Sequence, residues 1–153
     1  MTGGRLAAVS KYIDNEDAFC FTYGDGVSDV NITDTISFHK QHGKKATVTA
    51  VYPVARFGVL DIDGDSVKGF EEKPHGDAGM INGGFFVLSP DVLSLISGPD
   101  CTWEQEPLKE LASSGNLKAF HHNGFWQPMD TLRDKIYLEK LWNEGSAPWK
   151  TWD

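Results

Sequence analysis

Two aspartates in this sequence could together hold a metal ion against a phosphate. Asp25 lies between two glycines directly after an apolar run, and Asp130 lies two residues after Pro128, directly before an amphipathic segment. A pair of carboxylates from distant parts of a chain can bind Mg²⁺ while water and phosphate oxygens complete the octahedron. Each aspartate also has a simpler interpretation. Asp25 could be a solvated turn residue, and an aspartate in the position of Asp130 is most often a helix N-cap.

Two further segments could bind a sugar phosphate. Residues 71–74 read Glu-Glu-Lys-Pro, so that Lys73 would offer a positive charge to the phosphate while Glu72 accepts sugar hydroxyls. Residues 82–84 read Asn-Gly-Gly and could offer the Asn82 amide and bare backbone to sugar hydroxyls. The alternatives are a solvated surface turn for the first segment and a plain bulge for the second.

Other motifs and the composition exclude several classes of function. His39 and His42 lie one helical turn apart but lack a carboxylate partner, so they are predicted to be a surface pair rather than a metal site. The sequence has no Gly-x-Ser-x-Gly, Walker loop or Gly-x-Gly-x-x-Gly, which argues against a hydrolase triad, an NTPase and a dinucleotide-binding protein. Cys20 and Cys101 form neither a metal pair nor a disulfide framework, so reduced thiols are expected.

The charge and hydropathy of the chain indicate where it works. The formal net charge is −8 and the basic residues are scattered, which argues against nucleic acid and against an anionic membrane as partners. No apolar run approaches the roughly 20 residues of a membrane span, and the first residues lack the apolar region of a signal peptide. A cytoplasmic protein is therefore expected.

An α/β fold is predicted to position these residues. With 153 residues, 40% of them hydrophobic, the chain is long enough for one domain, predicted as 1–153. Residues 18–23 predict a strand that is buried on both faces and delivers Asp25 at its carboxyl end, where open α/β sheets bind ligands. Further strands are predicted at 44–52, 80–89 and 117–122, with a hairpin of 57–62 and 66–72 around Gly64. The strand at 80–89 is interrupted by residues 82–84, where a backbone or a ligand must come close.

Four helices and an aromatic tail complete the prediction. Residues 7–13 could form a short helix, Thr33 would cap a helix from 34 to 42, and Thr102 would open a capping box and a helix to about 112. Asp130 or Thr131 would cap a last helix through residue 142. The apolar stripe of that helix consists of Leu132, Ile136, Leu138, Leu141 and Trp142. Trp149 and Trp152 in the tail are expected to dock on this chain or on a partner.

Five segments, in this order, resemble sugar-1-phosphate nucleotidylyltransferases. They are residues 2–6 (TGGRL), 21–27 (FTYGDGV), 70–74 (FEEKP), 80–86 (MINGGFF) and 125–134 (FWQPMDTLRD). The last segment, together with TWEQEPL at 102–108, is most similar to the branch of the family that transfers cytidylyl groups to glucose 1-phosphate. Uridylyl and thymidylyl relatives share the glycine-aspartate-glycine and Glu-Lys-Pro segments. These two segments therefore indicate the fold and the type of reaction better than they indicate which nucleotide base is used.

The resemblance implies a Rossmann-like nucleotide-diphospho-sugar transferase fold, a mixed sheet flanked by helices that is incomplete at the N-terminus. It implies CTP and glucose 1-phosphate as substrates, CDP-glucose as product, Mg²⁺ as cofactor and a homo-oligomer at full length. The implied catalytic residues are Asp25, Lys73 and Asp130, of which the two aspartates hold Mg²⁺. Thr2 and Arg5 would border the nucleotide, and the other substrate-binding residues would be Gly3, Tyr23, Gly24, Gly58, Glu72, Lys73, Asn82 and Gly83.

One departure from the family leaves a rival open. Family members begin with a strand and a glycine-rich loop that grips the triphosphate, and nothing in this sequence corresponds to that loop. The chain therefore resembles the carboxyl-terminal three fifths of such an enzyme, with an ending like that of the family. The 153 residues alone are expected to be inactive, and the rival to the enzyme is a non-catalytic fragment for sugar-nucleotide binding or oligomerisation.

Overall fold

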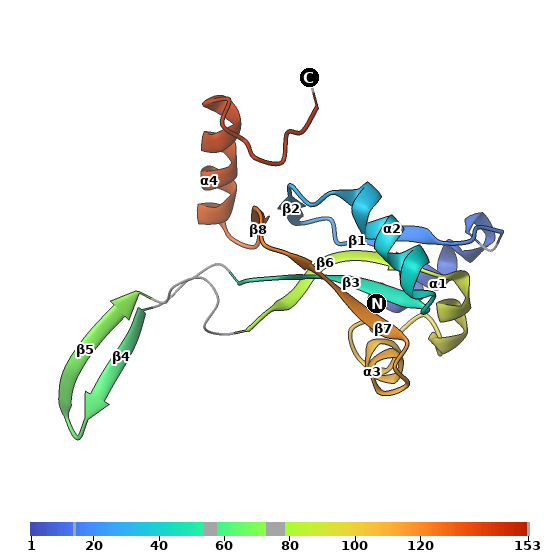
Figure 1. The fold of residues 1–153 in the computed structure, drawn as a ribbon, viewed down its shortest axis with the longest axis horizontal. Helices are drawn as coiled ribbons and strands as arrows, with labels where there is room; N and C mark the ends of the chain where they lie inside the picture. The colour runs from blue at the N-terminus through green and yellow to red at the C-terminus, as the bar shows by residue number, and fades with distance from the viewer. Residues whose placement is uncertain (14, 54–57, 73–78, 153) are drawn as a thin grey trace. The chain divides into compact units, whose positions relative to one another are not determined.

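The computed structural model describes residues 1–13, 15–53, 58–72 and 79–152 (Figure 1). The chain divides into two compact units, each of which is described by itself. Unit 1 comprises Met1–Gly24, Asn31–Thr49 and Gly84–His121, and unit 2 comprises Asp25–Val30, Ala50–Gly83 and His122–Asp153.

Unit 1 is built on a four-stranded sheet with helical segments on both faces. The sheet order is β1-β6-β3-β7, in which β6 and β3 continue into unit 2. Its elements are α1 (Thr2–Ala8), η1 (Ser10–Tyr12), β1 (Phe19–Thr22), α2 (Ile32–His42), β3 (Ala46–Val51), β6 (Ile81–Leu88), η2 (Pro90–Leu95), α3 (Glu106–Ser113) and β7 (Leu117–His122). The strand predicted at 117–122 is confirmed to the residue.

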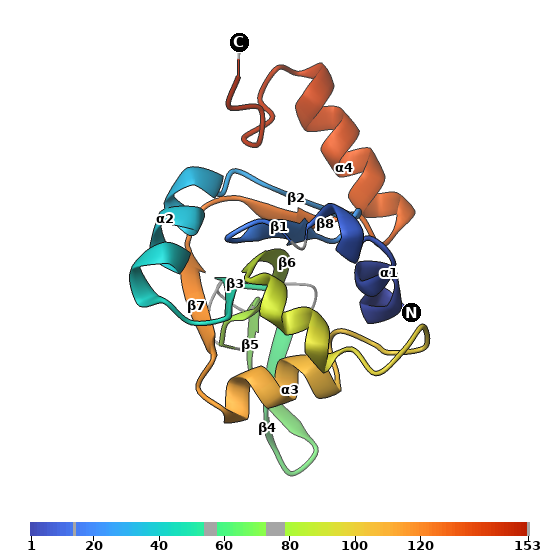
Figure 2. The same cartoon turned by 90° about the vertical axis from the view of Figure 1, so that its right-hand side faces the viewer.

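The helices α2 and α3 lie on opposite sides of this sheet (Figures 1 and 2). On the α3 side the core consists of buried residues from α1, η2, α3, the turn before α3 and the two central strands: Leu6, Ala46, Phe86, Leu88, Val92, Trp103 and Leu111. Because successive strand residues point to opposite faces, Thr47 and Thr49 of β3 face α2, and both are fully buried. The sheet therefore has an aromatic and aliphatic core on one face, and buried threonines on the face toward α2.

Strand β1 differs from its prediction as a strand buried on both faces. Its residues alternate between half-buried and exposed, with Phe19 and Phe21 packed on the core and Cys20 exposed. The reason is position, because β1 pairs antiparallel with β6 on one side only and is the edge of its sheet. A strand at the margin of a sheet can be covered on one face and open to solvent on the other, as the exposed Cys20 shows.

Strand β6 runs through the three residues that were predicted to interrupt it. Gly84 adopts a φ of 79°, and a Cβ at this position would lie 2.7 Å from a ring carbon of Tyr23. The Tyr23 N–H also donates to the Gly84 carbonyl, at 3.0 Å. The predicted close approach at residues 82–84 is thus made by the Tyr23 ring and backbone.

The helix α2 begins earlier and is less exposed than the sequence indicated. Its N-cap is Asn31, whose side chain accepts the Asp34 N–H, so Thr33 lies inside the helix instead of capping it. His39 is 4% exposed and faces β3, which corrects the prediction of a surface pair. His39 Nδ1 and His42 Nε2 lie 2.9 and 2.7 Å from the Thr47 hydroxyl.

The capping box predicted at Thr102 does not form. Helix α3 begins at Glu106 with Pro107 in its first turn, and its N-cap Gln105 makes no side-chain capping bond. The Trp103 N–H is instead capped by the Thr2 hydroxyl of α1, at 3.0 Å, and Thr2 donates to Glu104 Oε2 at 2.7 Å. A long-range contact to α1 therefore replaces the local cap.

Unit 2 contains a hairpin, a short ribbon and the last helix. Strands β4 (Gly58–Asp63) and β5 (Ser66–Glu72) pair antiparallel, which confirms the predicted hairpin. Strands β2 (Gly26–Ser28) and β8 (Trp126–Pro128) pair antiparallel with Gly26 opposite Pro128. Helix α4 spans Leu132–Asn143.

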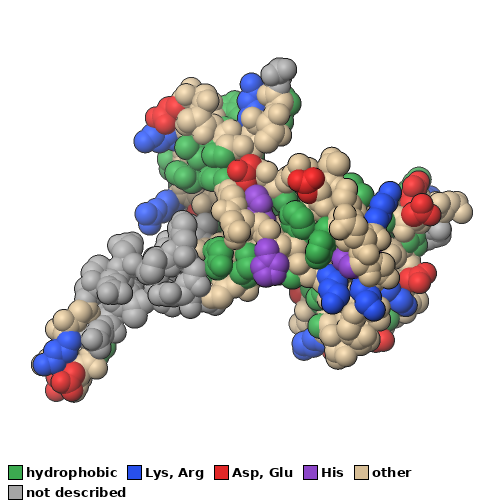
Figure 3. Space-filling model, in the orientation of Figure 1, with side chains coloured by type: hydrophobic (Ala, Val, Ile, Leu, Met, Phe, Trp, Pro, Cys, Tyr) green, Lys and Arg blue, Asp and Glu red, His purple; other side chains and the backbone are tan. Residues whose placement is uncertain are grey.

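Most of the apolar stripe of α4 is exposed. Leu138 is buried, whereas Leu132 and Ile136 are 70% and 56% exposed, and hydrophobic surface is visible over this helix in Figure 3. In the tail, the Trp149 ring lies 5.5 Å from the Phe125 ring, so this tryptophan docks on the chain as expected. Within the described ranges, no helix is both long and apolar enough to cross a bilayer.

Candidate active site

The ribbon of β2 and β8 brings Asp25 and Asp130 to the same end. Asp25 directly precedes β2 and Asp130 follows β8 by two residues, and the strands are antiparallel. The Met129 N–H donates to the Asp25 carbonyl at 2.7 Å, so the pairing extends one residue beyond the ribbon. Both aspartates are exposed. Two carboxylates that are about 100 residues apart in the sequence thus stand on neighbouring backbones.

Asp130 is not the N-cap of α4. Thr131 holds that position, with its hydroxyl accepting the Asp134 N–H at 3.2 Å and its own N–H donating to Asp134 Oδ2 at 3.0 Å. These reciprocal bonds form a complete capping box. The capping interpretation of Asp130 is therefore wrong, and its carboxylate stands one residue before the positive end of the helix dipole.

Buried Gln127 fixes β8 to the start of α4. The Gln127 side chain is 5% exposed and donates to Asp134 Oδ1 at 3.1 Å and to the Pro128 carbonyl at 3.0 Å. Because Asp134 is also the acidic member of the capping box, one carboxylate joins strand and helix. The backbone around Asp130 is held on both sides.

The Trp126 side chain connects the ribbon to the Asn-Gly-Gly segment. Its indole N–H donates to the Gly83 carbonyl at 2.8 Å, and both residues belong to unit 2. The two aspartates and the Asn82-Gly83 segment thus belong to a single hydrogen-bonded region. Sequence reasoning missed this link because nothing in the spacing of residues 83 and 126 indicates it.

Thr2 and Arg5, the residues predicted to border the nucleotide, lie in unit 1 at the start of the chain, and Tyr23 lies in the same unit after β1. The Glu104 carboxylate accepts hydrogen bonds from Thr2 and from the Tyr23 side chain. Burial raises the pKa of Glu104, but these hydrogen bonds and one from a backbone N–H outweigh it and hold the pKa below its usual range. Glu104 was not among the predicted site residues, although it falls in the TWEQEPL segment.

The glycines near Thr2 are required by packing. A Cβ on Gly3 would lie 3.0 Å from the Cys101 carbonyl oxygen, and a Cβ on Gly4 would lie 2.0 Å from that of Pro99. Both glycines let α1 approach the segment before α3. The predicted substrate role of Gly3 and Arg5 stays a prediction.

The structure describes only the backbone of Gly58 and Glu72, and it does not describe Lys73. Gly58 and Glu72 face each other across the β4–β5 hairpin as the first and last paired residues, and only their backbones are described. Lys73 lies outside the described residues. Their roles toward the sugar phosphate stay predictions.

The donor set fits a hard cation. Mg²⁺ is usually bound by one or two protein carboxylates, with waters and substrate phosphate oxygens completing its coordination. Asp25 and Asp130 supply two carboxylates on adjacent backbones, and the described ranges contain no group of three His, Cys, Asp or Glu that could form a closed metal cage. An open two-carboxylate site is what a substrate-bridged metal requires.

Most of the chain matches a known protein family. The family model described as nucleotidyl transferase matches residues 2–128. The chain belongs to this family. The predicted mixed sheet flanked by helices is therefore confirmed as a nucleotidyltransferase fold. HddC from Yersinia pseudotuberculosis has a similar structure, with a TM-score of 0.65 at 26% identity, over 89% of this chain and 60% of HddC.

Two curated relatives belong to the branch that the sequence motifs indicated. The chain is 63% identical over 153 residues to glucose-1-phosphate cytidylyltransferase of Salmonella typhi, which covers all of this chain and 60% of the relative. It is 42% identical to a probable glucose-1-phosphate cytidylyltransferase of Bacillus subtilis, over 99% of this chain and 59% of the relative. This nucleotidyl transferase chain thus spans about three fifths of the length of these relatives.

Proposed function

We propose that this chain is the part of a glucose-1-phosphate cytidylyltransferase that carries the metal and sugar-phosphate sites. The complete enzyme joins CTP and glucose 1-phosphate to give CDP-glucose and pyrophosphate. The observation that carries the proposal is the β2–β8 register, which sets Asp25 beside Asp130. The 63% identity to the Salmonella typhi cytidylyltransferase supports the choice of CTP and glucose 1-phosphate.

In this proposal the chain acts by positioning charge. The reaction is attack by a phosphate oxygen of glucose 1-phosphate on the α-phosphorus of CTP, with pyrophosphate leaving, and such transfers depend on alignment and charge neutralisation. Asp25 and Asp130 would hold Mg²⁺, which would supply positive charge to the phosphates. Lys73 binds the phosphate of the sugar, Glu72, Asn82 and Gly83 bind its hydroxyls, and Gly58 borders the same substrate.

The remaining proposed contacts are on the nucleotide side. Thr2 and Arg5 border CTP, and Gly3, Tyr23 and Gly24 supply close-approaching backbone and ring surface. We further propose that the complete enzyme is a cytoplasmic homo-oligomer.

The test is a chimera in which this chain replaces the matched 153 residues of the Salmonella typhi relative. We expect the chimera to make CDP-glucose from CTP, and to use UTP or dTTP poorly. Asp25→Asn and Asp130→Asn should each lower the rate by more than about 100-fold, because even the outer partners of a metal are worth about 10–100-fold. Thermal unfolding should be unchanged in both variants.

The outcomes separate the alternatives. Preference for UTP or dTTP would assign the chain to a uridylyl or thymidylyl relative. Binding of CDP-glucose without turnover would support the non-catalytic fragment. A near-normal rate for Asp130→Asn would remove Asp130 from the metal site.

A further inference from the structure

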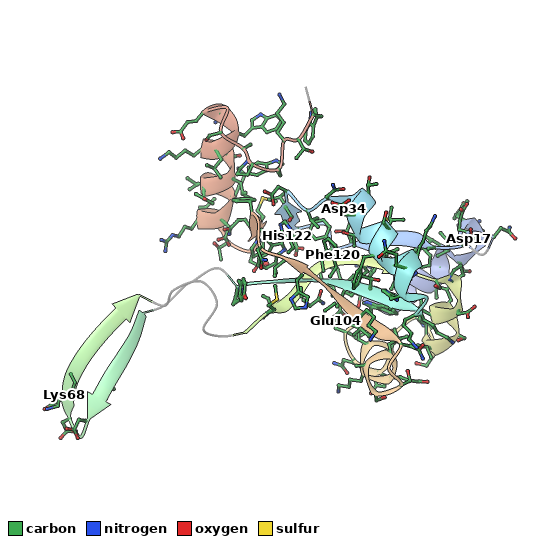
Figure 4. The ribbon with its side chains drawn as sticks, in the orientation of Figure 1. Asp17, Asp34, Lys68, Glu104, Phe120 and His122 are labelled. Carbon is green, nitrogen blue, oxygen red and sulfur yellow. The ribbon has the colours of Figure 1, made fainter. Side chains whose placement is uncertain are left out.

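The imidazole of His122 lies close to three oxygen atoms at one end of the β2–β8 ribbon. Asp25 and Asp130 lie at the other end. His122 Nε2 lies 2.9 Å from Asp29 Oδ1, 3.2 Å from Ser28 Oγ and 3.2 Å from the Phe125 carbonyl oxygen. Figure 4 shows His122 at the end of β7, beside the ribbon. All four residues belong to unit 2, and we name them the His122 cluster.

The protons of the His122 cluster can be assigned from its partners. The Ser28 hydroxyl donates to the Phe125 carbonyl at 2.8 Å and accepts the Val30 N–H at 3.2 Å, so Ser28 Oγ can only accept from the ring. The Phe125 carbonyl and the Asp29 carboxylate are acceptors as well. His122 Nε2 must therefore carry a proton.

The contact of Nε2 with Asp29 is electrostatic. Asp29 Oδ1 is buried and, within the described part of the chain, accepts no hydrogen bond of good geometry, although it lies 2.9 Å from the ring nitrogen. One N–H shared between Ser28 and Phe125 cannot also point straight at the carboxylate. The cluster is not a nucleophile triad either, since a triad places its serine and its carboxylate on opposite ring nitrogens.

The His122 cluster is tightly packed and largely shielded from solvent. His122 and Asp29 side chains are 11% and 31% exposed. A Cβ on Gly124 would lie 2.5 Å from Asp29 Oδ1 and 2.7 Å from His122 Cε1. Only glycine at position 124 lets the turn before β8 close over the histidine and the carboxylate.

We propose that His122 is a positioning residue that holds the β2–β8 ribbon in register and thereby sets the spacing of Asp25 and Asp130. The proposal rests on the proposed function, in which these aspartates bind Mg²⁺. The ribbon has three paired residues on each strand, and a two-stranded ribbon is marginal by itself. Beyond the ladder at this end, the Asp29 N–H donates to the Phe125 carbonyl at 3.2 Å, and the described residues show no other backbone bond between the two strands there.

The distance over which His122 acts is short. Three residues of a strand span about 10 Å, so a shift at Ser28 and Phe125 reaches the pairing of Asp25 with Met129 at the other end. A slip of one residue would turn every side chain of the ribbon to the other face. His122 fixes the end at which the chain enters β8, and the metal ligands stand where it leaves.

The test uses matched variants of the 153-residue chain and NMR spectroscopy. The amide nitrogen of glutamine lies as far along its side chain as Nε2 of histidine, whereas that of asparagine lies only as far as Nδ1. His122→Gln therefore keeps the donor in place and His122→Asn withdraws it. The control is His121→Gln, because His121 is the exposed neighbour on β7.

Two quantities are measured on each variant. The first is the Mn²⁺ concentration that half-broadens the amide signals of Asp25 and Asp130. The second is the hydrogen-exchange rate of the Met129 amide, which is bonded to the Asp25 carbonyl. We expect His122→Asn to raise the Mn²⁺ midpoint by about 10-fold, the lower end for a residue that orients metal ligands, and to speed Met129 exchange by about 10-fold. His122→Gln and His121→Gln should match wild type.

Each outcome decides the proposal. Wild-type midpoint and exchange in His122→Asn overturn it, and faster exchange with an unchanged midpoint shows a merely structural role and overturns it too. If Mn²⁺ broadens neither aspartate signal in wild type, or if Asp130→Asn leaves the broadening intact, the metal pair of the proposed function is disproved. The Met129 exchange rate alone then decides whether His122 holds the ribbon.

Discussion

Acid should destabilise this chain through two neighbouring histidines on α2, the buried His39 and the half-buried His42. The Lys44 backbone N–H donates to His42 Nδ1 at 2.9 Å, so in neutral His42 the proton is on Nε2, which donates to the Thr47 hydroxyl. Thr47 then donates to His39 Nδ1, and His39 Nε2 donates to Ser89 Oγ at 3.3 Å. Every donor in this chain of hydrogen bonds has an acceptor only while both rings are neutral.

The pKa values of His39 and His42 are both lowered, which favours the neutral rings that these hydrogen bonds need. Burial and then the nearby His42 lower the pKa of His39. Burial, then Lys118 and to a smaller extent Lys44, lower the pKa of His42 against an opposing backbone hydrogen bond. Above pH 6.5, the ordinary value, the rings are neutral in the folded and the unfolded chain. As the pH falls below that value, the unfolded chain takes up protons first, so the free energy of unfolding falls.

The size of the effect follows from one proton per histidine. A group that stays neutral in the folded chain but titrates at its ordinary pKa in the unfolded chain removes about 1 kcal/mol between pH 7 and pH 5.5. This amount is the upper limit for His39, which is 4% exposed and whose pKa is lowered by burial. His42, which is only half-buried, should contribute less.

The assay is reversible urea unfolding at several pH values between 7 and 5.5. His39→Gln removes the titrating group, so its unfolding free energy should fall less steeply with acid than that of wild type, by up to about 1 kcal/mol between pH 7 and pH 5.5. At pH 7 the variant should be less stable by about 1–3 kcal/mol, because the Thr47 hydroxyl loses its acceptor. His121→Gln, at an exposed position, should keep the wild-type slope. Equal slopes for wild type and His39→Gln would refute the reasoning.

Three further variants test separate features of the chain. Thr131→Ala removes the capping box of α4 and should lower stability by about 1 kcal/mol in thermal unfolding, whereas Asp130→Asn should leave it unchanged; equal losses would mean that both residues cap the helix. Gly4→Ala would place a Cβ 2.0 Å from the Pro99 carbonyl oxygen, and we expect a loss of about 1–3 kcal/mol in urea unfolding, with no loss showing that α1 can move away. In the chimera, Lys73→Met should weaken the use of glucose 1-phosphate by about 2 kcal/mol and leave CTP affinity nearly unchanged, and an equal rise in both KM values would remove Lys73 from the sugar-phosphate contact.

Local patterns predicted most of the elements. The hairpin around Gly64 and the strand at 117–122 were recovered because turn residues and alternation are local signals. The start of α3 was misplaced because Thr2, about 100 residues away, replaces the local cap. Its hydroxyl accepts the Trp103 N–H and donates to the Glu104 carboxylate. The exposure of β1 depends on its place at the sheet edge, which no local window contains.

Candidate site residues could be named from the sequence, but the contacts that connect them could not. Asp25 and Asp130 stand out because glycine and proline neighbours mark the ends of elements, but their pairing depends on the β2–β8 register. Asp29 and His122 carry no motif, and their contact across a sequence separation of 93 residues could not be inferred from spacing. Trp126 lies in a recognised motif, yet nothing in the sequence indicates its hydrogen bond to the Gly83 carbonyl.

The separation of β2 from β8 along the chain has a consequence for folding kinetics. The Ser28 hydroxyl and the Phe125 carbonyl, which meet at the end of the ribbon, are 97 residues apart in the sequence. Contacts of such long range are slow to form because the entropy of closing the loop is lost before any bond rewards it. The helices and the local β4–β5 hairpin should therefore form early, and the ribbon late. The amide of Met129 should then be among the last to gain protection during refolding. Asp25 and Asp130, which we propose as metal ligands, should therefore come together only in the closing step of folding.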